Sequence, residues 1–280
     1  MDKKGINMNI AKRIVFVSAL AAVAPAVAAE NAEKPRECVF FVGAHPDDSE
    51  GFAATAFLLA EKYDVHVVDL TRGELGLGRK GLDDGTTAVR RIAEEKAACA
   101  VLGATPHFLC EIDGDACATM ESVRKLHELL LKYRPKAVFT HWPVDGHPDH
   151  VQTAAVVSHA LCWIDRAAGK YGTIQRYFYE VLLCQTANWH PLYSVDVTRT
   201  MAKKQEMLSK YACQNAGNEL VKEKTSQAAL RGSQRVPKCA YAETFTTFDG
   251  KPIENGVLEQ LKETALVKCP VERASCPFAN

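Results

Sequence analysis

The chain has 280 residues, of which 47% are hydrophobic and 24% are charged. This is the balance of an ordinary globular protein, and it excludes a chain that is disordered throughout. The 34 Lys and Arg residues match 34 Asp and Glu residues, so we do not expect a strongly basic surface that binds nucleic acid. The length allows one large α/β domain or two small ones.

Residues 1–28 have the features of a signal peptide. Basic residues at the start precede an apolar run over residues 14–27, which ends in the Ala-Val-Ala pattern that a signal peptidase accepts. The run contains Pro25 and is shorter than the roughly 20 apolar residues of a membrane-spanning helix. We therefore expect a periplasmic or secreted protein, with residues 29–280 as its mature domain and no stable membrane span after cleavage. A retained N-terminal anchor is the alternative.

All ten cysteines follow the predicted signal peptide, and their even number in an oxidising compartment indicates some disulfides. No Cys-x-x-Cys sequence occurs, so a zinc knuckle or a thioredoxin-like redox centre is not supported. Cys99 and Cys162 fall in helical apolar patterns and are expected to be buried thiols. Two pairs could close short loops: Cys110 with Cys117, and Cys269 with Cys276.

Apolar runs alternate with helical patterns from the start of the predicted domain. The strands are predicted at residues 37–44, 64–71, 106–112 and 136–141. The helices are predicted at about 52–63, at 87–103, from Met120 onward, and after the fourth strand to about Ile164. This order predicts a single α/β domain with a Rossmann-like parallel sheet and helices on both faces. A further strand at 177–185 and a helix at 198–214 are expected, and the pattern is poorly defined from about residue 215.

Two loops that follow predicted strands are dense in histidine and aspartate. AHPDDSE follows the first strand, and HWPVDGHPDH follows the fourth. Open parallel sheets bind ligands beyond the carboxyl ends of their strands, so both loops lie where a ligand is expected. Imidazole and carboxylate groups suit Zn²⁺, and the same donors suit Fe²⁺ or another divalent ion. Helix capping would explain either loop alone, but two such loops at one edge favour a metal site.

These two loops resemble the signature motifs of the PIG-L/LmbE-like family of zinc-dependent de-N-acetylases. LTRGELG, RRIAEEKAACAVLG, the Asp113-Gly114 pair and KKQEMLSKYACQ are similar to further segments of that family in their order and spacing. The resemblance covers about residues 37–215. It implies the same Rossmann-like fold and an enzyme that removes an N-acetyl group from an N-acetylglucosamine-type amino sugar.

The resemblance also implies a role for each residue at a motif position. His45, Asp48 and His150 would be the zinc ligands. Asp47 would be the general base that takes a proton from the attacking water. His147 would protonate the leaving amine or stabilise the oxyanion.

Three further residues are expected to assist. Arg91 and Asp113 would bind sugar hydroxyls, with a solvated surface salt bridge as the alternative for each. Arg90 would take the place of Arg91 if the helical register differs by one. Asp145 would orient the imidazole of His147, as carboxylates behind metal sites do, or it would cap the following helix.

Two positions need separate comment. His141 ends the fourth predicted strand, and we expect it to be a packed residue rather than a ligand. Where the family usually has a glycine pair after the first motif, this chain has Gly51 and Phe52. We expect the bulkier side chain to narrow the floor of the pocket or to shift the helix, which bears on the identity of the substrate.

We therefore expect an exported, zinc-dependent N-deacetylase whose partners are small molecules or glycans that carry an N-acetylated amino sugar. Outside the cytoplasm, glycans, peptidoglycan fragments and antibiotic-like glycosides are the plausible substrates. One alternative is an amidase that removes a larger acyl group from a similar glycoside. Another is a non-catalytic carbohydrate-binding protein, against which the intact Asp47 and His147 speak.

Overall fold

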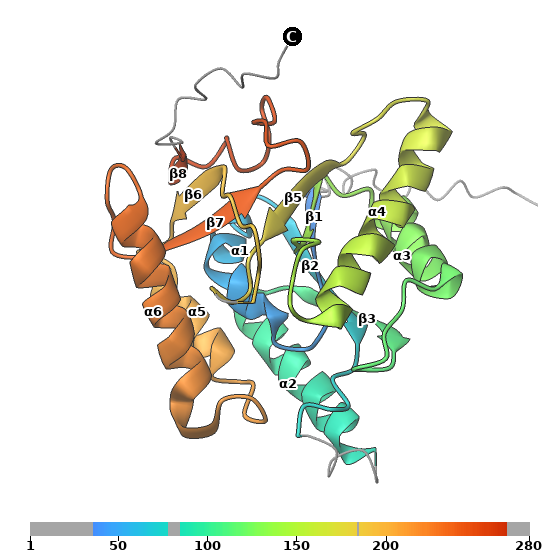
Figure 1. Ribbon diagram of the computed structural model, residues 1–280, viewed down its shortest axis with the longest axis horizontal. Coiled ribbons are helices and arrows are strands. Elements are labelled where there is room, and N and C mark those ends of the chain that lie inside the picture. Colours follow the sequence, from blue (N-terminus) through green and yellow to red (C-terminus); the bar gives the residue numbers. More distant parts are fainter. Residues whose placement is uncertain (1–35, 78–84, 184, 268–280) are drawn as a thin grey trace, which may run out of the picture. The chain divides into compact units, whose positions relative to one another are not determined.

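The computed structural model describes residues 36–77, 85–183 and 185–267 (Figure 1). The predicted signal peptide lies outside the described residues, and so do Cys184, Cys269 and Cys276. Within the described part of the chain, no helix combines the length and the apolar character that crossing a membrane requires.

A single sheet lies at the centre of the described residues. Its eight strands have the order β3-β2-β1-β4-β5-β7-β6-β8. The parallel part comprises β1 (Cys38–Gly43), β2 (Asp64–Thr71), β3 (Thr105–Glu111), β4 (Ala137–His141) and β5 (Gln175–Tyr179). Strand β1 is central and pairs in parallel with both β2 and β4. All of its residues are buried, which explains why its sequence is a continuous apolar run.

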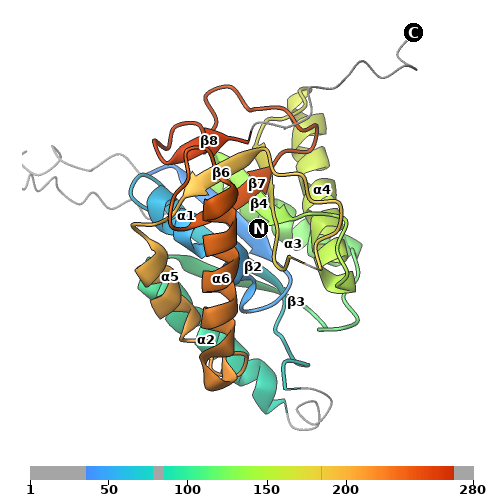
Figure 2. The same cartoon turned by 60° about the vertical axis from the view of Figure 1, so that its left-hand side comes forward.

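Helices cover both faces of the parallel part, which confirms the predicted α/β fold (Figures 1 and 2). One face carries α1 (Ala53–Leu59), α2 (Thr86–Leu102) and α5 (Met201–Leu208). The other face carries α3 (Met120–Tyr133) and α4 (Pro148–Ala168). Successive side chains of a strand point to opposite faces. Accordingly, Val39 and Phe41 belong to the core under the first group of helices, and Phe40 and Val42 to the core under the second.

The C-terminal part makes the sheet mixed rather than wholly parallel. Strands β6 (Tyr193–Asp196), β7 (Ala242–Thr246) and β8 (Thr264–Leu266) pair with their neighbours in antiparallel fashion. The region after residue 215 forms a short 3₁₀ turn, η3 (Ala216–Asn218), and then α6 (Glu219–Gln234). The helix expected over 198–214 ends earlier, at Leu208, and the strand expected over 177–185 ends at Tyr179.

The cysteines differ from the expectation in two respects. Cys110 and Cys117 are both free and exposed, so the short-loop disulfide between them is wrong for this structure. Cys110 lies on β3, and its thiol turns back toward the carbonyl of Phe108, with 3.8 Å between sulfur and oxygen. Cys99 is a buried thiol as expected, whereas Cys162 is only half-buried.

A buried ion pair from the C-terminal part holds the start of α1. This helix has no side-chain cap of its own. Instead, the Glu243 carboxylate accepts hydrogen bonds from the backbone N–H groups of Ala54, at 3.1 Å, and Thr55, at 2.7 Å. Lys204 on α5 donates to the same carboxylate at 2.7 Å, and both charged side chains are 3% exposed. Strand β7 and helix α5 therefore fix α1, directly after the AHPDDSE loop.

We expect Lys204→Met to lower the free energy of unfolding by about 3–5 kcal/mol, because it leaves the Glu243 carboxylate buried without its cation. Urea unfolding measures this change. Lys136→Met is the matched control, because Lys136 pairs at 2.8 Å with Glu37 where both side chains are about half exposed. That pair should contribute less than about 1 kcal/mol. Equal, small effects of the two substitutions would contradict the structural role of the buried pair.

Candidate metal centre and active site

The turn after β1 is organised by the Asp48 carboxylate. Its Oδ2 accepts the backbone N–H groups of Ala44, at 2.6 Å, and His45, at 2.8 Å. The same oxygen lies 2.9 Å from Nε2 of His141, at the end of β4. The second oxygen, Oδ1, faces Nε2 of His150 on α4 at 3.4 Å. One carboxylate thus connects the ends of β1 and β4 with the first turn of α4.

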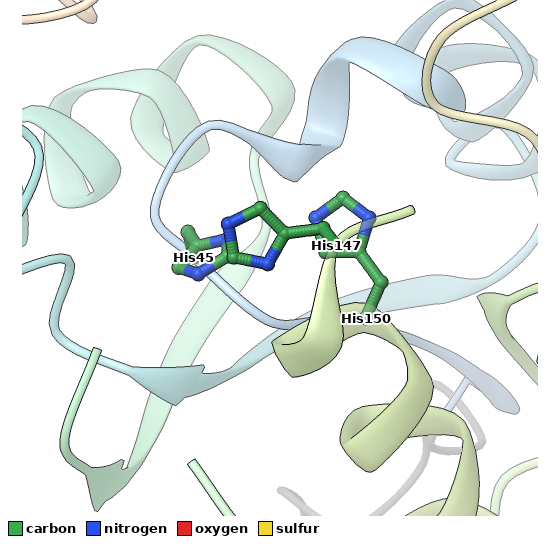
Figure 3. A group of neighbouring side chains, drawn as sticks. All are labelled: His45, His147 and His150. Atoms are coloured by element: carbon green, nitrogen blue, oxygen red, sulfur yellow. The ribbon is translucent and has the colours of Figure 1, made fainter. Parts of the chain in front are cut away.

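The rings of His45, His147 and His150, which come from the two motifs, lie next to one another (Figure 3). Nδ1 of His45 lies 3.7 Å from Asp48, so the structure brings the three expected ligands together. In the described part of the chain, the ligand atoms form three overlapping groups, each within 4.8 Å: His45, His147 and His150; Asp48, His141 and His150; and His45, Asp113 and Asp149.

This donor set fits a divalent metal ion. It consists of imidazole nitrogens and carboxylate oxygens, which suit Zn²⁺ and also Fe²⁺. Nδ1 of His141 and Oδ1 of Asp149 are buried without a hydrogen-bond partner among the described residues. Buried polar atoms normally have a partner, so a cluster that leaves two of them unpaired is consistent with a site that holds a further group.

His141 belongs to this cluster, although the sequence indicated only a packed residue. Its side chain is fully buried, and its ring stacks on that of His150 with the centroids 4.0 Å apart. Burial, and next the neighbouring His150, lower the pKa of His141 to about 4. The ring is therefore neutral near pH 7 and is available either as a packing partner or as a nitrogen donor.

Asp145 orients His150 rather than the ring of His147. Its Oδ1 lies 3.1 Å from Nδ1 of His150, whereas its contact with His147 is to the backbone N–H, at 2.9 Å, and not to the ring. Gln185 donates to the same carboxylate oxygen at 2.9 Å. Burial lowers the pKa of His150, but the Asp48 and Asp145 carboxylates outweigh it and raise that pKa to about 9. The expected partner of Asp145 was thus wrong. Its contact with His150 is instead that of a carboxylate that orients a metal-binding histidine.

His147 is the N-terminal cap of α4. Its Nδ1 accepts the backbone N–H of Asp149 at 3.3 Å. A neutral imidazole with an accepting Nδ1 carries its hydrogen on Nε2, so Nε2–H is the donor that remains for other groups. Burial lowers the pKa of His147, and the neighbouring His45 and His150 lower it further.

Asp47 is held apart from this cluster by Arg91. The guanidinium of Arg91 donates to Oδ1 of Asp47 at 2.6 Å and to the carbonyl of Pro46 at 2.7 Å. Arg91 is 3% exposed, so the surface salt bridge proposed as its alternative role is wrong. Asp47 has a φ of 155°, and such strained backbone occurs mainly at functional sites. Burial raises the pKa of Asp47, and the Arg91 guanidinium opposes the rise.

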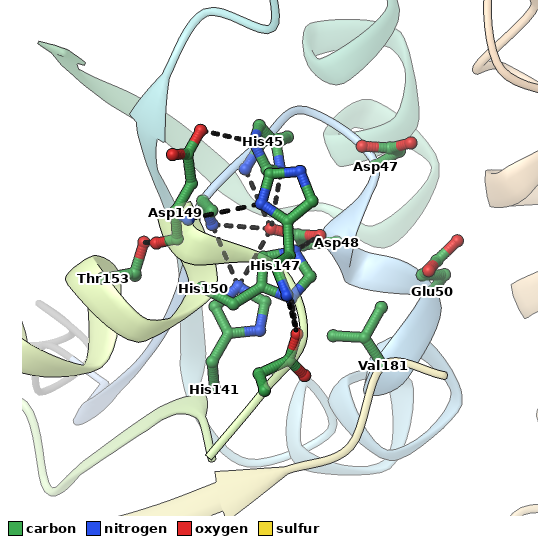
Figure 4. A network of polar contacts seen from close by, with 12 residues as sticks. His45, Asp47, Asp48, Glu50, His141, His147, Asp149, His150, Thr153 and Val181 are labelled. Carbon is green, nitrogen blue, oxygen red and sulfur yellow. Dashed lines mark hydrogen bonds and ion pairs between the residues drawn. The ribbon is translucent and has the colours of Figure 1, made fainter. Parts of the chain in front are cut away.

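Two carboxylates flank the far side of the His45 ring, and the sequence analysis assigned no role to one of them. Oδ1 of Asp113 lies 3.3 Å from Nε2 of His45. Oδ2 of Asp149 lies 3.1 Å from the same nitrogen (Figure 4). Asp113 is buried and accepts the backbone N–H of Leu75 at 2.8 Å, so it is not a surface residue. Burial lowers the pKa of His45, but hydrogen bonds to three carboxylates raise it well above its usual value. Asp149 stands between the two histidines of the second motif, so that motif could have identified it.

Most of these groups line one cavity of about 480 Å³: His45, Asp47, Asp48, Arg91, Asp113, His147 and His150. Helix α6 closes one side of it with Lys224, a buried residue that no motif identified. Its ammonium group donates to the carbonyl of Val181 at 2.8 Å and pairs with Glu50 at 3.0 Å. Burial raises the pKa of Glu50 to about 7, and Lys224 opposes the rise. A helix outside the motif region thus completes the site.

Phe52 does not narrow this cavity, contrary to the expectation. Its side chain is fully buried and stacks on Phe41 of β1, with the ring centroids 4.3 Å apart. At Gly51 the backbone passes close to the residue that follows β5, and a larger side chain would not fit there. An added Cβ would lie 2.7 Å from the carbonyl oxygen of Glu180. The Phe52 side chain therefore adds to the hydrophobic core and does not line the cavity.

Comparisons with known proteins found a matching family model, curated relatives and solved structures. Residues 40–161 match the family model described as PIG-L, GlcNAc-PI de-N-acetylase. This segment is therefore similar to the PIG-L family. The chain is also 32% identical over 155 residues to a 1D-myo-inositol 2-acetamido-2-deoxy-alpha-D-glucopyranoside deacetylase of Thermobispora bispora. That match covers 45% of this chain, and the chain spans half the length of the curated relative.

Solved structures of other proteins share most of this fold. The N,N'-diacetylchitobiose deacetylase of Pyrococcus horikoshii has a TM-score of 0.65 at 22% identity, covering 77% of this chain and 85% of its own. The 4-carboxy-2-hydroxymuconate hydratase of Pseudomonas putida has a TM-score of 0.68 at 24% identity, covering 78% of this chain and 99% of its own. Because these two proteins carry names of different reactions, the fold alone does not assign the chemistry.

We expect Asp145→Asn to weaken Zn²⁺ binding by about 10–100-fold, because it removes the carboxylate that holds Nδ1 of His150. Competition with a chromophoric chelator measures this affinity. Asp115→Asn is the control, since Asp115 is exposed in a neighbouring loop. Unchanged affinity in the Asp145 variant would show that His150 needs no such support or is not a ligand.

Proposed function

We propose that this protein is a metal-dependent amide hydrolase that removes an N-acetyl group from an N-acetylglucosamine-type amino sugar. The observation that carries the proposal is the separation of Asp47 from the cluster of candidate ligands. Arg91 holds this partly buried carboxylate at 2.6 Å, in the wall of the cavity that the histidines also line. The names of the matched family and of the curated relative support the substrate class.

His45, Asp48 and His150 are the proposed metal ligands, with Zn²⁺ as the expected ion and Fe²⁺ or another divalent ion suited to the same donors. When bound, the ion polarises the amide carbonyl and makes a water more acidic. The Asp48 carboxylate is held in a fixed position for metal binding, because two backbone N–H groups bind its Oδ2 while its Oδ1 faces His150.

The chain's own residues account for the proton transfers. Oδ1 of Asp47 is bound by Arg91, so Oδ2 is the oxygen that would take a proton from the attacking water. The raised pKa that burial gives Asp47 makes it a stronger base. Nε2–H of His147 would donate to the carbonyl oxygen as negative charge develops there. The carbon–nitrogen bond then breaks, the amine nitrogen gains a proton, and acetate and a free amino sugar result.

Acetate release from a panel of N-acetylglucosamine compounds tests this function, with the bound metal quantified in the same sample. We expect release with one metal ion bound per chain and loss of activity after treatment with a chelator. Bound metal without turnover of any compound would favour the carbohydrate-binding alternative. A chain that binds no metal would contradict the proposed ligand set.

Two variants separate the base from the ligands in the same assay. Asp47→Asn should keep the metal and lose about 10²–10⁴-fold in kcat, the usual effect of removing a general base. His150→Ala should lose the metal as well as the activity. Normal turnover in a metal-loaded Asp47 variant would refute the base, and full metal loading of the His150 variant would refute the ligand.

We also propose that the protein is exported to the periplasm or the exterior. This proposal depends on the sequence of residues 1–28, which lie outside the described residues. N-terminal sequencing of the protein from its native host should find a mature chain that begins at Ala29. A chain that keeps the apolar run would favour the membrane anchor instead.

A further inference from the structure

A second compartment lies beside the catalytic cavity, between the loop after β5 and helix α6. This compartment has a volume of about 590 Å³. Leu182, Gln185 and Glu223 line both spaces, so the two share a wall. Leu183 and Leu230 complete the apolar part of the second compartment. A ligand in the catalytic cavity could therefore extend into this compartment.

The two spaces differ in chemical character. The catalytic cavity is lined by carboxylates, imidazoles, Arg91 and Lys224, whereas most of the exposed wall of the second compartment is apolar. Leu183 is 41% exposed and Leu230 is 42% exposed, so neither serves to fill the core. Apolar side chains gathered around a hollow are typical of ligand-binding grooves.

The shared wall lies next to the proposed reaction centre. Nε2 of Gln185 is 3.2 Å from Nδ1 of His150, a proposed metal ligand. Leu182 follows Val181, whose side chain is buried against the catalytic cavity. A substituent of the ligand that entered the second compartment would thus begin beside the amide carbonyl that is hydrolysed.

The opposite wall is the one assigned to the sugar. Asp113 and Asp149 both contact Nε2 of His45. In Figure 4, Asp149 and Val181 lie on opposite sides of the histidine group. A secondary amide is planar and trans, so its acyl chain and its nitrogen substituent leave in opposite directions. With the sugar at Asp113, the acyl group points toward Val181 and Leu182.

We propose that the second compartment is an acyl-chain subsite, and that the preferred substrates carry a straight acyl chain longer than acetyl on the nitrogen of the amino sugar. This inference rests on the proposed function, since it uses the same water, base and carbonyl. Water adds to the amide carbon, the carbon–nitrogen bond breaks, and a medium-chain carboxylic acid leaves in place of acetate.

The test compares N-acetyl-, N-butyryl-, N-hexanoyl- and N-octanoylglucosamine with the full mature chain, metal-loaded, by following the common product glucosamine. We expect kcat/KM to rise with chain length, by up to about fourfold for each methylene that becomes buried. Hydrolysis of the acetyl compound with a flat or falling series would overturn the subsite and leave the proposed function intact.

A pair of leucine variants locates the effect. Leu230→Glu places a charge in the compartment and should reduce the ratio of octanoyl to acetyl kcat/KM by at least about tenfold. Leu131→Glu is the matched control, because Leu131 is 52% exposed on α3, on the other face of the sheet. That variant should keep the wild-type ratio. An unchanged ratio in Leu230→Glu would show that the chain lies elsewhere.

Two further arms separate the remaining outcomes. The octyl glycoside of N-acetylglucosamine carries its alkyl chain on the anomeric oxygen instead of the nitrogen. A higher kcat/KM with this compound alone would overturn the acyl assignment.

If no compound is hydrolysed, calorimetry measures the binding of N-octanoyl- and N-acetylglucosamine instead. Tighter binding of the octanoyl compound, lost in Leu230→Glu, would support the subsite while the proposed hydrolysis fails, and equal or absent binding would overturn both.

Discussion

The hydrogen bonds that the Asp48 carboxylate makes at the end of β1 are the constraint on which the site depends. Two backbone N–H groups bind one of its oxygens and turn the chain sharply after the strand. The same carboxylate reaches His141 at the end of β4 and His150 on α4. Burial would raise the pKa of Asp48, but these two histidines hold it well below its usual value, so the group is ionised. A single buried anion therefore attracts both motifs to one edge of the sheet.

Elements outside the matched segment hold this arrangement in place. The family model ends at residue 161, yet Lys204, Lys224 and Glu243 all come from later in the chain. Each is buried and paired with an opposite charge. Unpaired buried charges are costly, so these pairs form only when the C-terminal elements dock correctly. The antiparallel end of the sheet and α6 thus serve as a frame for the two motif loops, and α6 also supplies one wall of the cavity.

Much of this could be predicted from the sequence, because the signals are local. The strands of the parallel part are long apolar runs, and α2 and α3 have helical patterns that end close to where the structure ends them. The two motifs identify most of the groups that meet at the site. The role of Asp149 was not predicted although the residue lies within a motif, because only the two histidines of HPDH were assigned roles.

The remaining features depend on contacts between distant parts of the chain. Strands β6 to β8 have three to five residues each, which is too short for a two-residue period to stand out. Lys224 looks like a surface lysine of a polar helix until the fold places it against Glu50 and Val181. His141 becomes part of the cluster only because β4 lies beside β1. The partner of Asp145 likewise depends on the geometry of the first turn of α4.

The fold is shared by proteins named for hydrolysis and for hydration, so the chemistry depends on the positions of the metal ligands and the base. A crystal structure of the zinc-loaded protein, with anomalous data at the zinc edge, tests this most directly. The account predicts one zinc ion bound by His45, Asp48 and His150, with Asp47 off the metal and still paired with Arg91. Zinc coordinated by Asp47, or bound away from this cluster, would contradict it.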